Sequence, residues 1–415
     1  QLKYSGTNAS QIIQNCINAL GSRATLFLRG DTFIFDANII INGKSHIKIT
    51  GDNPKLKLKD GIVYSALNNV IHILNSDHIV IEYLEIDGNA ANINEAWTGI
   101  LLEKCSHTLI QHNYLHDLNG TRNNLRVVAS YNVTLDDNLI ENCGGKGMDL
   151  WSNYGISIHD IFVTNNRIFN TGTYGSGDDA MFAGNGGVEG AYSRAYGIVF
   201  ANNFVNGSEG HGLRICGSNP IDIVIEGNTF RNTALGVPAI ALKPVHYSSP
   251  SNIIVVNNHC YYGGIHTLLG VGNYIICNNE LLEQAETGGG GGLMIDNALN
   301  QCTVMGNIIQ RTQQGGLKIQ NGTRYMVSYN TVFGGTSNRL VIGAACSDME
   351  LWGNIVEGDM ISDNGTRTII NGVGTNNGDP TVTKTGNGNG REGITVWDYN
   401  TWIGYQYVNG TWRTF

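Results

Sequence analysis

One short phrase, an Asn closely followed by an apolar residue at the end of an alternating apolar and polar run, recurs along most of this chain. At intervals of 21 to 37 residues, the phrase contains Asn113, Asn138, Asn166, Asn203, Asn228, Asn258, Asn279, Asn307, Asn330 and Asn354. A repeat of this period is one supersecondary unit, which buries its apolar face only when its neighbours stack on it. The sequence therefore predicts a solenoid.

The segments between these Asn residues have the pattern of short strands. Runs such as DIFVTNN, IDIVIEGN and NIIVVNN alternate with period two, and each is followed by a second run that often opens with Gly, as in TGILLE, HGLRIC and GGLKIQ. Two or three strands per period of about 25 residues leave no room for a helix, which excludes leucine-rich repeats and is typical of a parallel β-helix. Each Asn is expected at a tight bend in the left-handed region, with its amide bonded to its own turn and to the stacked copy.

The predicted fold class is all-β, a single-stranded right-handed parallel β-helix of the pectin-lyase-like kind with an N-terminal helical cap. Residues 1–30 are expected to form the cap, because Ser10 to Leu20 has helical spacing with Ser10 as N-cap. Residues 31–372 would form the β-helix and residues 373–415 a loop-rich C-terminal tail or cap. The aromatic end of this tail would pack on the last coils or on a neighbouring subunit, so a homotrimer is one expectation.

Composition restricts the partners of the chain. A formal net charge of -9 without a Lys/Arg run argues against nucleic-acid binding. The sequence contains no stretch of about 18 apolar residues, so no membrane-spanning helix is expected. A start at Gln1 fits a processed protein, secreted or at the cell surface, and equally a trimmed chain.

The eight Cys are spread singly along the chain. This spacing favours cysteines that serve as small buried core residues over one or two disulfides, and it indicates no metal or cofactor site.

Placing the Gly-opening strands in register separates an inward from an outward side. The inward positions are Ile100, Leu125, Met148, Ala180, Leu213, Ile240 and Leu293. The outward positions include Arg126, Asp149, Arg214 and Lys318; Lys146, Asp178, Asp179 and His211 precede the strands, and Lys243 ends one. Coils stack about 4.8 Å apart, so carboxylates one or two coils apart have the separations that glycosidic cleavage uses.

Three of these segments resemble a known family. GDDAMFAG, SEGHGLRICGS and VPAIALK are similar, in order and on successive coils, to the Asp-Asp, Gly-His-Gly and Arg-Ile-Lys motifs of polygalacturonase-type glycoside hydrolases. The resemblance implies that Asp178 is the general acid, that Asp179 helps to activate water, that His211 tunes the acid, and that Lys243 holds a sugar carboxylate.

The chain departs from this family at two positions. Gly145-Lys146-Gly147 stands where the family has Asn-Thr-Asp, so Asp149 is the candidate for the third carboxylate. Ala241 replaces the Arg of Arg-Ile-Lys, and Arg214 is its candidate substitute. Both departures favour a uronate- or amino-sugar-containing polymer over plain pectin. The style of the repeat also resembles the methanogen disaggregatases, which depolymerise a chondroitin-like cell-wall polymer.

The functional hypothesis is a depolymerase that cleaves an acidic polysaccharide with carboxylates as acid and base. The insertion GNGGVEGAYSRAYG adds Glu189, Tyr192 and Arg194 to the substrate-binding candidates Arg126, Lys146, Arg214 and Lys243. Two alternatives stay open: a lyase or C5-epimerase that uses Lys or Arg, and a glycan-binding tail-spike or adhesin without catalysis. A structural alternative stays open for each residue, because Asp178 and Asp179 suit a turn and the cations suit surface ion pairs.

Overall fold

The chain divides into two compact units, Gln1–Pro220 and Ile221–Phe415, each of which is described by itself. In this computed structural model the described residues are 8–62, 68–93, 96–119, 123–153, 155–172, 178–185, 193–217, 220–234, 237–244, 251–268, 272–282, 292–296, 301–310, 316–334, 340–356, 361–363, 369–375, 382–384, 394–398, 403–408 and 411–414.

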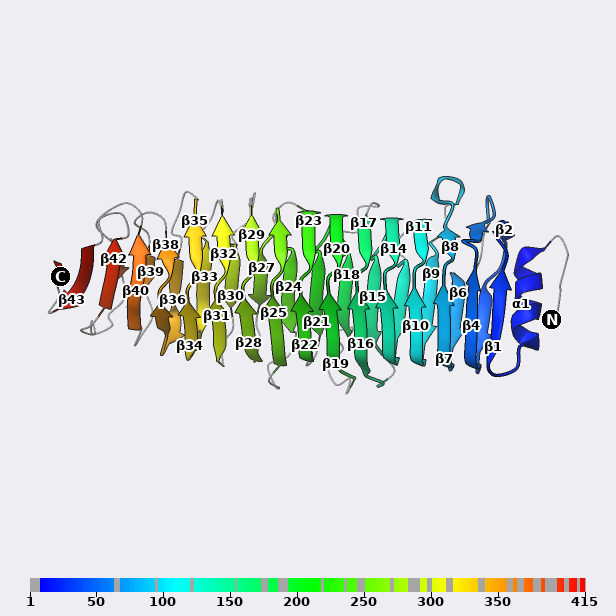
Figure 1. The fold of residues 1–415 in the computed structure, drawn as a ribbon, viewed down its shortest axis with the longest axis horizontal. Coiled ribbons are helices and arrows are strands. Elements are labelled where there is room, and N and C mark those ends of the chain that lie inside the picture. The colour runs from blue at the N-terminus through cyan, green and yellow to red at the C-terminus, as the bar shows by residue number, and fades with distance from the viewer. Residues whose placement is uncertain are drawn as a thin grey trace. The chain divides into compact units, whose positions relative to one another are not determined.

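The first unit consists of three parallel ladders of strands. Consecutive strands of the chain belong to successive ladders, so three strands complete one coil (Figure 1). The first ladder contains β1 (Ala24–Leu28), β4 (Ser45–Gly51), β7 (Asp77–Glu82), β10 (Ser106–Gln111), β13 (Tyr131–Asp136), β16 (Ile158–Thr164) and β19 (Ala195–Ala201). The second contains β2 (Thr32–Phe35), β5 (Lys55–Leu58), β8 (Glu85–Asp87), β11 (Tyr114–Leu118), β14 (Leu139–Cys143), β17 (Arg167–Thr171) and β20 (Phe204–Ser208). The third contains β3 (Ile39–Asn42), β6 (Asn69–Leu74), β9 (Thr98–Glu103), β12 (Leu125–Val128), β15 (Met148–Ser152), β18 (Met181–Asn185) and β21 (Leu213–Gly217).

The second unit repeats this arrangement. Its first ladder contains β22 (Ile221–Glu226), β25 (Ser251–Val256), β28 (Gly272–Cys277), β31 (Cys302–Met305), β34 (Tyr325–Ser328), β37 (Glu350–Trp352), β40 (Ile369–Thr375) and β42 (Ile394–Asp398). The second contains β23 (Thr229–Thr233), β26 (His259–Tyr261), β29 (Glu280–Leu282), β32 (Ile308–Gln310), β35 (Thr331–Phe333) and β38 (Ile355–Val356). The third contains β24 (Ile240–Pro244), β27 (Ile265–Leu268), β30 (Leu293–Asp296), β33 (Leu317–Thr323), β36 (Leu340–Ser347), β39 (Ile361–Asp363) and β41 (Val382–Lys384).

Antiparallel pairing occurs within the segment that the sequence assigns to a loop-rich tail. There β42 pairs with β43 (Ile403–Val408), and β43 pairs with β44 (Thr411–Thr414). Among the described residues, all other strand pairs within each unit are parallel. The predicted all-β parallel helix is therefore confirmed in both units.

The core of each unit is lined by the residues that the alternation predicts. All seven residues assigned to the inward side are fully buried: Ile100, Leu125, Met148, Ala180, Leu213, Ile240 and Leu293. The predicted register is wrong by one residue on a single strand, since Met148 pairs with Met181 and not with Ala180. This slip is allowed because Ala180 and Met181 are both apolar and both enclosed.

The repeated Asn residues form buried ladders. In the first unit, Oδ1 of Asn166 accepts hydrogen bonds from the backbone N–H and the Nδ2 of Asn138, at 2.9 and 3.0 Å. Nδ2 of Asn166 in turn donates to Oδ1 of Asn203 at 3.0 Å and to a backbone carbonyl oxygen, that of Leu135. The same pattern links Asn228 through Asn354 in the second unit. The structural role predicted for these amides is confirmed.

The left-handed residue of each bend is the one before the ladder Asn, and not the Asn itself as the sequence analysis expects. Positive φ values occur at Asp137, Asn165, Asn202, Asn257 and Asn278, at Gly227, Gly306 and Gly353, and also at His112 and Tyr329. Gly, Asn and Asp tolerate that region best, which explains why two turn-forming residues stand side by side in many repeats.

The predicted N-terminal helix is present as α1 (Ala9–Ala19), and it packs against β2 and β3 (Figure 1). Its N-cap is Asn8, whose side chain accepts from the N–H of Gln11 at 2.9 Å, so the assignment of Ser10 as N-cap is wrong. Ser10 lies in the first turn and bonds Asp36 instead, which ties the helix to the chain after β2. A 3-10 turn, η1 (Ala90–Asn92), follows β8.

All eight cysteines are free thiols, as the single spacing favours. Burial raises the pKa of Cys105 to about 11 and that of Cys143 to about 12, so these thiols stay protonated at neutral pH. In the part of the chain that the structure describes, no helix has the length and apolar character needed to cross a membrane.

Candidate active site

The third ladder of the first unit presents a column of polar and aromatic side chains on its outward side. Arg126 on β12 pairs with Asp149 on β15, Asp149 with Phe182 on β18, and Phe182 with Arg214 on β21. Adjacent strands therefore bring two arginines, a carboxylate and an aromatic ring onto one face. The outward positions predicted for Arg126, Asp149 and Arg214 fit this register.

A second column lies in the turns that precede these strands. Lys146, Asp179 and His211 each stand two residues before the paired positions Met148, Met181 and Leu213. Backbone hydrogen bonds hold successive turns together, as when the N–H of Ala180 donates to the carbonyl oxygen of His211 at 2.9 Å. The one-residue slip of register moves Asp179 into line with Lys146 and His211.

Glycine at position 147 makes this close stacking possible. A Cβ there would meet the carbonyl oxygen of Ala180 at 2.8 Å, which is closer than real Cβ contacts come. Gly147 stands between Lys146 and Met148, so its lack of a side chain lets the turn with Lys146 approach the turn with Asp179. Gly147, the second glycine of Gly-Lys-Gly, is therefore a packing requirement as well as part of a departure from the polygalacturonase pattern.

Asp179 is the buried centre of the cluster. Its side chain is 0% exposed, and its Oδ1 accepts hydrogen bonds from Nδ1 of His211 at 2.7 Å and from the backbone N–H of His211 at 3.0 Å. Its Oδ2 forms an ion pair with Nε of Arg214 at 2.9 Å. A carboxylate only accepts, so Nδ1 of His211 carries a proton and, in the neutral ring, Nε2 is the basic nitrogen.

Asp178 is the more accessible of the two adjacent carboxylates. Its side chain is 20% exposed, and its Oδ1 pairs with Nζ of Lys146 at 3.3 Å. The Asp178 carbonyl oxygen accepts from the N–H of Gly210, next to His211 in the following coil. The two Asp residues thus have different environments: one is enclosed and held by a His and an Arg, and the other faces the surface beside a Lys.

Asp149 is almost fully buried, and burial raises the pKa of its carboxyl above the ordinary value. The positive charges of Arg126 and Lys146 oppose this shift, while the negative charges of Asp178 and Asp179 add to it. Oδ2 accepts from Nδ2 of Asn123 at 2.9 Å and pairs with Nε of Arg126 at 2.9 Å. Oδ1 is enclosed without a hydrogen-bond partner among the described atoms.

Two aromatic residues that the sequence analysis did not select complete the face. Phe182 lies near two cations, with its ring centroid 5.4 Å from Nζ of Lys146 and 5.1 Å from Cζ of Arg214. Trp151 is half-buried, contacts Phe182 with ring centroids 5.6 Å apart, and lies 5.8 Å from Cζ of Arg126. Period-two counting from Asp149 would have placed Trp151 on the outward side.

The remaining residues predicted for the site belong to another segment of the first unit, to the second unit, or to the residues that the structure does not describe. Arg194 is exposed and follows β18 in the chain, whereas Asp178 and Asp179 precede that strand. Lys243 on β24 and Lys318 on β33 belong to the second unit. Glu189 and Tyr192 lie outside the described residues. The structure therefore brings together Arg126, Lys146, Asp149, Asp178, Asp179, His211 and Arg214.

This arrangement contains the components of acid–base chemistry on an anionic substrate. A surface carboxylate and an Asp-supported imidazole can move protons, and the nearby Lys and Arg can bind negative charge. The ion pairs Arg126–Asp149 and Arg214–Asp179 also fit the structural alternative that the cations serve as ion-pair partners.

Comparisons with known proteins agree with the fold. Residues 3–168 match the family model of the right handed beta helix region. The catalytic domain of a GH87 alpha-1,3-glucanase is similar with a TM-score of 0.60 at 12% identity, over 94% of this chain and 68% of the other. PfbA, a surface adhesin of Streptococcus pneumoniae, is similar with a TM-score of 0.56 at 12% identity, over 98% and 94%.

A third similar structure is the A-module of the Azotobacter vinelandii mannuronan C-5 epimerase AlgE4, with a TM-score of 0.50 at 14% identity, over 90% of this chain and 95% of the other. No curated protein matches the chain in sequence. At these identities the likenesses concern the fold alone. Together with the parallel ladders, the comparisons identify the fold of this chain as a right-handed parallel β-helix.

Proposed function

We propose that this protein is an enzyme that depolymerises an acidic polysaccharide at the outward face of β15, β18 and β21. The observation that carries the proposal is the pairing of an accessible Asp178 with Lys146 directly beside the buried Asp179–His211 pair. The turns before β15, β18 and β21 then hold a partly exposed carboxylate, a basic imidazole and a cation, which purely structural turns do not need.

In the proposed reaction, Asp178 donates a proton to the leaving glycosidic oxygen. Asp179 is fully enclosed, so we assign it to positioning His211 and Arg214 rather than to direct activation of water. A water molecule would give a proton to Nε2 of His211 as its oxygen bonds to the anomeric carbon, while the glycosidic C–O bond breaks and the leaving oxygen takes the proton of Asp178. Lys146 and Arg214 would bind a sugar carboxylate, and Trp151 would contact a sugar ring.

β-Elimination or C5-epimerisation of a uronate is the second candidate, and the Asp179–His211 pair favours it. A neutral imidazole held through Nδ1 presents Nε2 as a base, which can remove the proton next to a carboxylate that Lys146 or Arg214 neutralises. The same residues therefore serve either reaction, and the products distinguish the two. A polymeric glycan substrate would place the proposed activity outside the cell or at its surface.

The decisive experiment incubates the full chain with a panel of uronate-containing and neutral polysaccharides and analyses the products by mass spectrometry. Hydrolysis yields new reducing ends with addition of water, elimination yields an unsaturated uronate that absorbs in the ultraviolet, and epimerisation changes the uronate composition without chain cleavage. Asp178→Asn tests the site, and Asp160→Asn is the matched control because Asp160 is an exposed carboxylate paired with a His on β16.

We expect cleavage of an acidic polymer by the wild type and by Asp160→Asn, and its loss in Asp178→Asn with an unchanged circular dichroism spectrum. Full activity of Asp178→Asn would exclude this face as the active site. Binding of a glycan without any product would instead support the adhesin alternative.

A further inference from the structure

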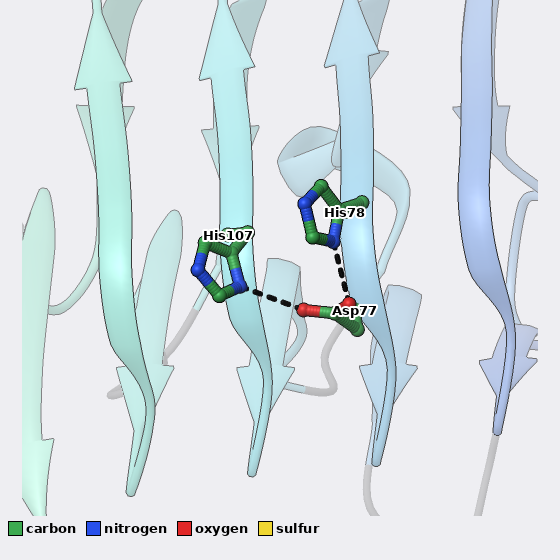
Figure 2. A group of neighbouring side chains, drawn as sticks. All are labelled: Asp77, His78 and His107. Carbon is green, nitrogen blue, oxygen red and sulfur yellow. Dashed lines mark hydrogen bonds and ion pairs between the residues drawn. The ribbon is translucent and has the colours of Figure 1, made fainter.

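A compact group of potential metal ligands lies on the first ladder, away from the strands that carry the proposed active site. Asp77 and His78 are the first two residues of β7, and His107 is the second residue of the neighbouring strand β10. Figure 2 shows the two imidazole rings on neighbouring strands, with a dashed line from each ring to one oxygen of the Asp77 carboxylate.

The potential ligand atoms of the three side chains lie close together. Nδ1 of His78 lies 2.5 Å from Oδ2 of Asp77, and Nδ1 of His107 lies 2.8 Å from Oδ1. One ligand atom from each residue, a ring nitrogen of each His and a carboxylate oxygen of Asp77, can be selected so that all three lie within 4.8 Å of one another. The side chains are 41 to 46% exposed, so an ion from solvent can reach them.

The backbone explains why two histidines from successive coils meet here. His46, His78 and His107 occupy equivalent positions and all adopt positive φ, at 57°, 52° and 47°. Their rings stack, with centroids 4.3 Å apart between His46 and His78 and 4.5 Å apart between His78 and His107. Stacking restricts the rings, so both Nδ1 atoms are held toward Asp77 before any ion arrives.

The carboxylate of Asp77 is fixed by a neighbouring hydroxyl. Ser106 Oγ donates to Oδ1 of Asp77 at 2.6 Å, so this carboxylate keeps its orientation between the coils.

His107 has a neighbour suited to its metal-bound form. The amide of Asn132 lies 3.1 Å from Nε2 of His107. An amide can donate to Nε2 when the proton is on Nδ1, or accept from Nε2–H after rotation when Nδ1 binds a metal. Asn132 can therefore support both states of the ring.

We propose that Asp77, His78 and His107 bind a divalent transition-metal ion of the Zn²⁺, Ni²⁺ or Cu²⁺ class and connect β7 to β10. Two imidazole nitrogens and one carboxylate oxygen suit these ions, whereas Ca²⁺ and Mg²⁺ prefer oxygen ligands. A second His/Asp group, formed by Asp87, His116 and Asp117, is less suited because it offers one imidazole and two carboxylates instead of two imidazoles.

The test titrates Zn²⁺ into the tag-free full chain by calorimetry, and Co²⁺ by visible absorption. We expect one equivalent of Zn²⁺ to bind to the wild type and Co²⁺ to give the absorption of a site with nitrogen ligands. His107→Ala and Asp77→Asn should each abolish this binding event. Asn132→Ala should weaken it by roughly 10- to 100-fold, because it removes the group that orients His107.

His159→Ala is the matched control, since His159 pairs with Asp160 at 2.8 Å on the same ladder but lacks a second His at the same carboxylate. It should bind Zn²⁺ like the wild type. Thermal unfolding of each variant checks that the fold persists, and added Zn²⁺ should raise the midpoint of the wild type and of His159→Ala and leave that of His107→Ala and Asp77→Asn unchanged. Absence of a binding event in the wild type, or equal binding in His107→Ala, overturns the proposal.

Discussion

Nδ1 of His211 donates a hydrogen bond to Oδ1 of Asp179 over 2.7 Å, and the residues that make this bond are 32 positions apart in the chain. The bond fixes both the orientation and the protonation of the imidazole. Its removal should therefore affect proton transfer more than substrate binding.

The first prediction concerns Asp179→Asn, which keeps the shape of the side chain but lets an amide face Nδ1. We expect the turnover number to fall by roughly 10²- to 10⁴-fold while KM changes little, because general acid–base catalysis contributes about that much. Steady-state kinetics over a range of pH measure both constants. Asp160→Asn should retain wild-type values, and a large KM change with normal turnover in Asp179→Asn would contradict the positioning role.

The second prediction concerns recognition of substrate charge by Lys146. Lys146→Gln should raise KM by about 10- to 100-fold, since a hydrogen bond to a charged group is worth about 1.5–3 kcal/mol. The effect should disappear for a substrate whose carboxylates have been chemically reduced, and Lys57→Gln on β5 serves as the control. If the reduced polymer shows the same KM difference, Lys146 does not bind a carboxylate.

The third prediction concerns the stability of the Asn ladder. Asn279→Ala should lower the free energy of unfolding by about 2–4 kcal/mol, because it leaves buried amide groups of Asn258 without their acceptor. Asn252→Ala on the same unit should cost less than about 1 kcal/mol, since Asn252 is exposed and bonds only surface side chains in the described part. Chemical denaturation of both variants measures the difference. Equal midpoints would show that the Asn ladder does not contribute to the stability of the protein.

The fourth prediction concerns pH and Glu82. Its carboxyl is nearly buried, which acts to raise its pKa, but contacts with Lys48 at 2.5 Å, Gln111 at 2.9 Å and Thr50 at 3.2 Å lower the pKa below the ordinary 4.5. A lowered folded-state pKa stabilises the protein above the unfolded-state pKa, and this stability is lost as pH falls through the folded-state pKa.

Glu82→Gln should therefore be less stable than the wild type at pH 7, and the difference should shrink once the pH falls below about 4.5. Denaturation at several pH values measures it, with the exposed Glu226→Gln as control. A difference that stays constant down to low pH would show that packing, and not charge, is the cause.

Much of the fold could be predicted because its determinants are local and repeated. Ladder positions such as Asn166 and inward positions such as Leu125 recur at regular intervals, and period-two alternation assigns their side chains to a face. The register at Met181 could not be predicted, since two adjacent apolar residues both suit the core. The N-cap was also misplaced, because Asn8 and Ser10 are both good capping residues.

The candidate site was partly accessible to the same reasoning. Alternation and register indicated Asp178, His211 and Arg214, whereas Trp151 and Phe182 carried no polar signal and were missed. The different environments of Asp178 and Asp179 could not be predicted, because burial depends on the residues of the coils above and below.

By itself the sequence determined the solenoid, its Asn ladders and the face on which polar residues gather, because each depends on spacing along the chain. Only the tertiary structure decided which residues meet across coils. It paired His211 with Asp179, Lys146 with Asp178 and His107 with Asp77, each about one coil apart in the chain. The physical reason is that coils vary in length, so contacts between them follow from backbone register and from which turns can approach closely, as at Gly147.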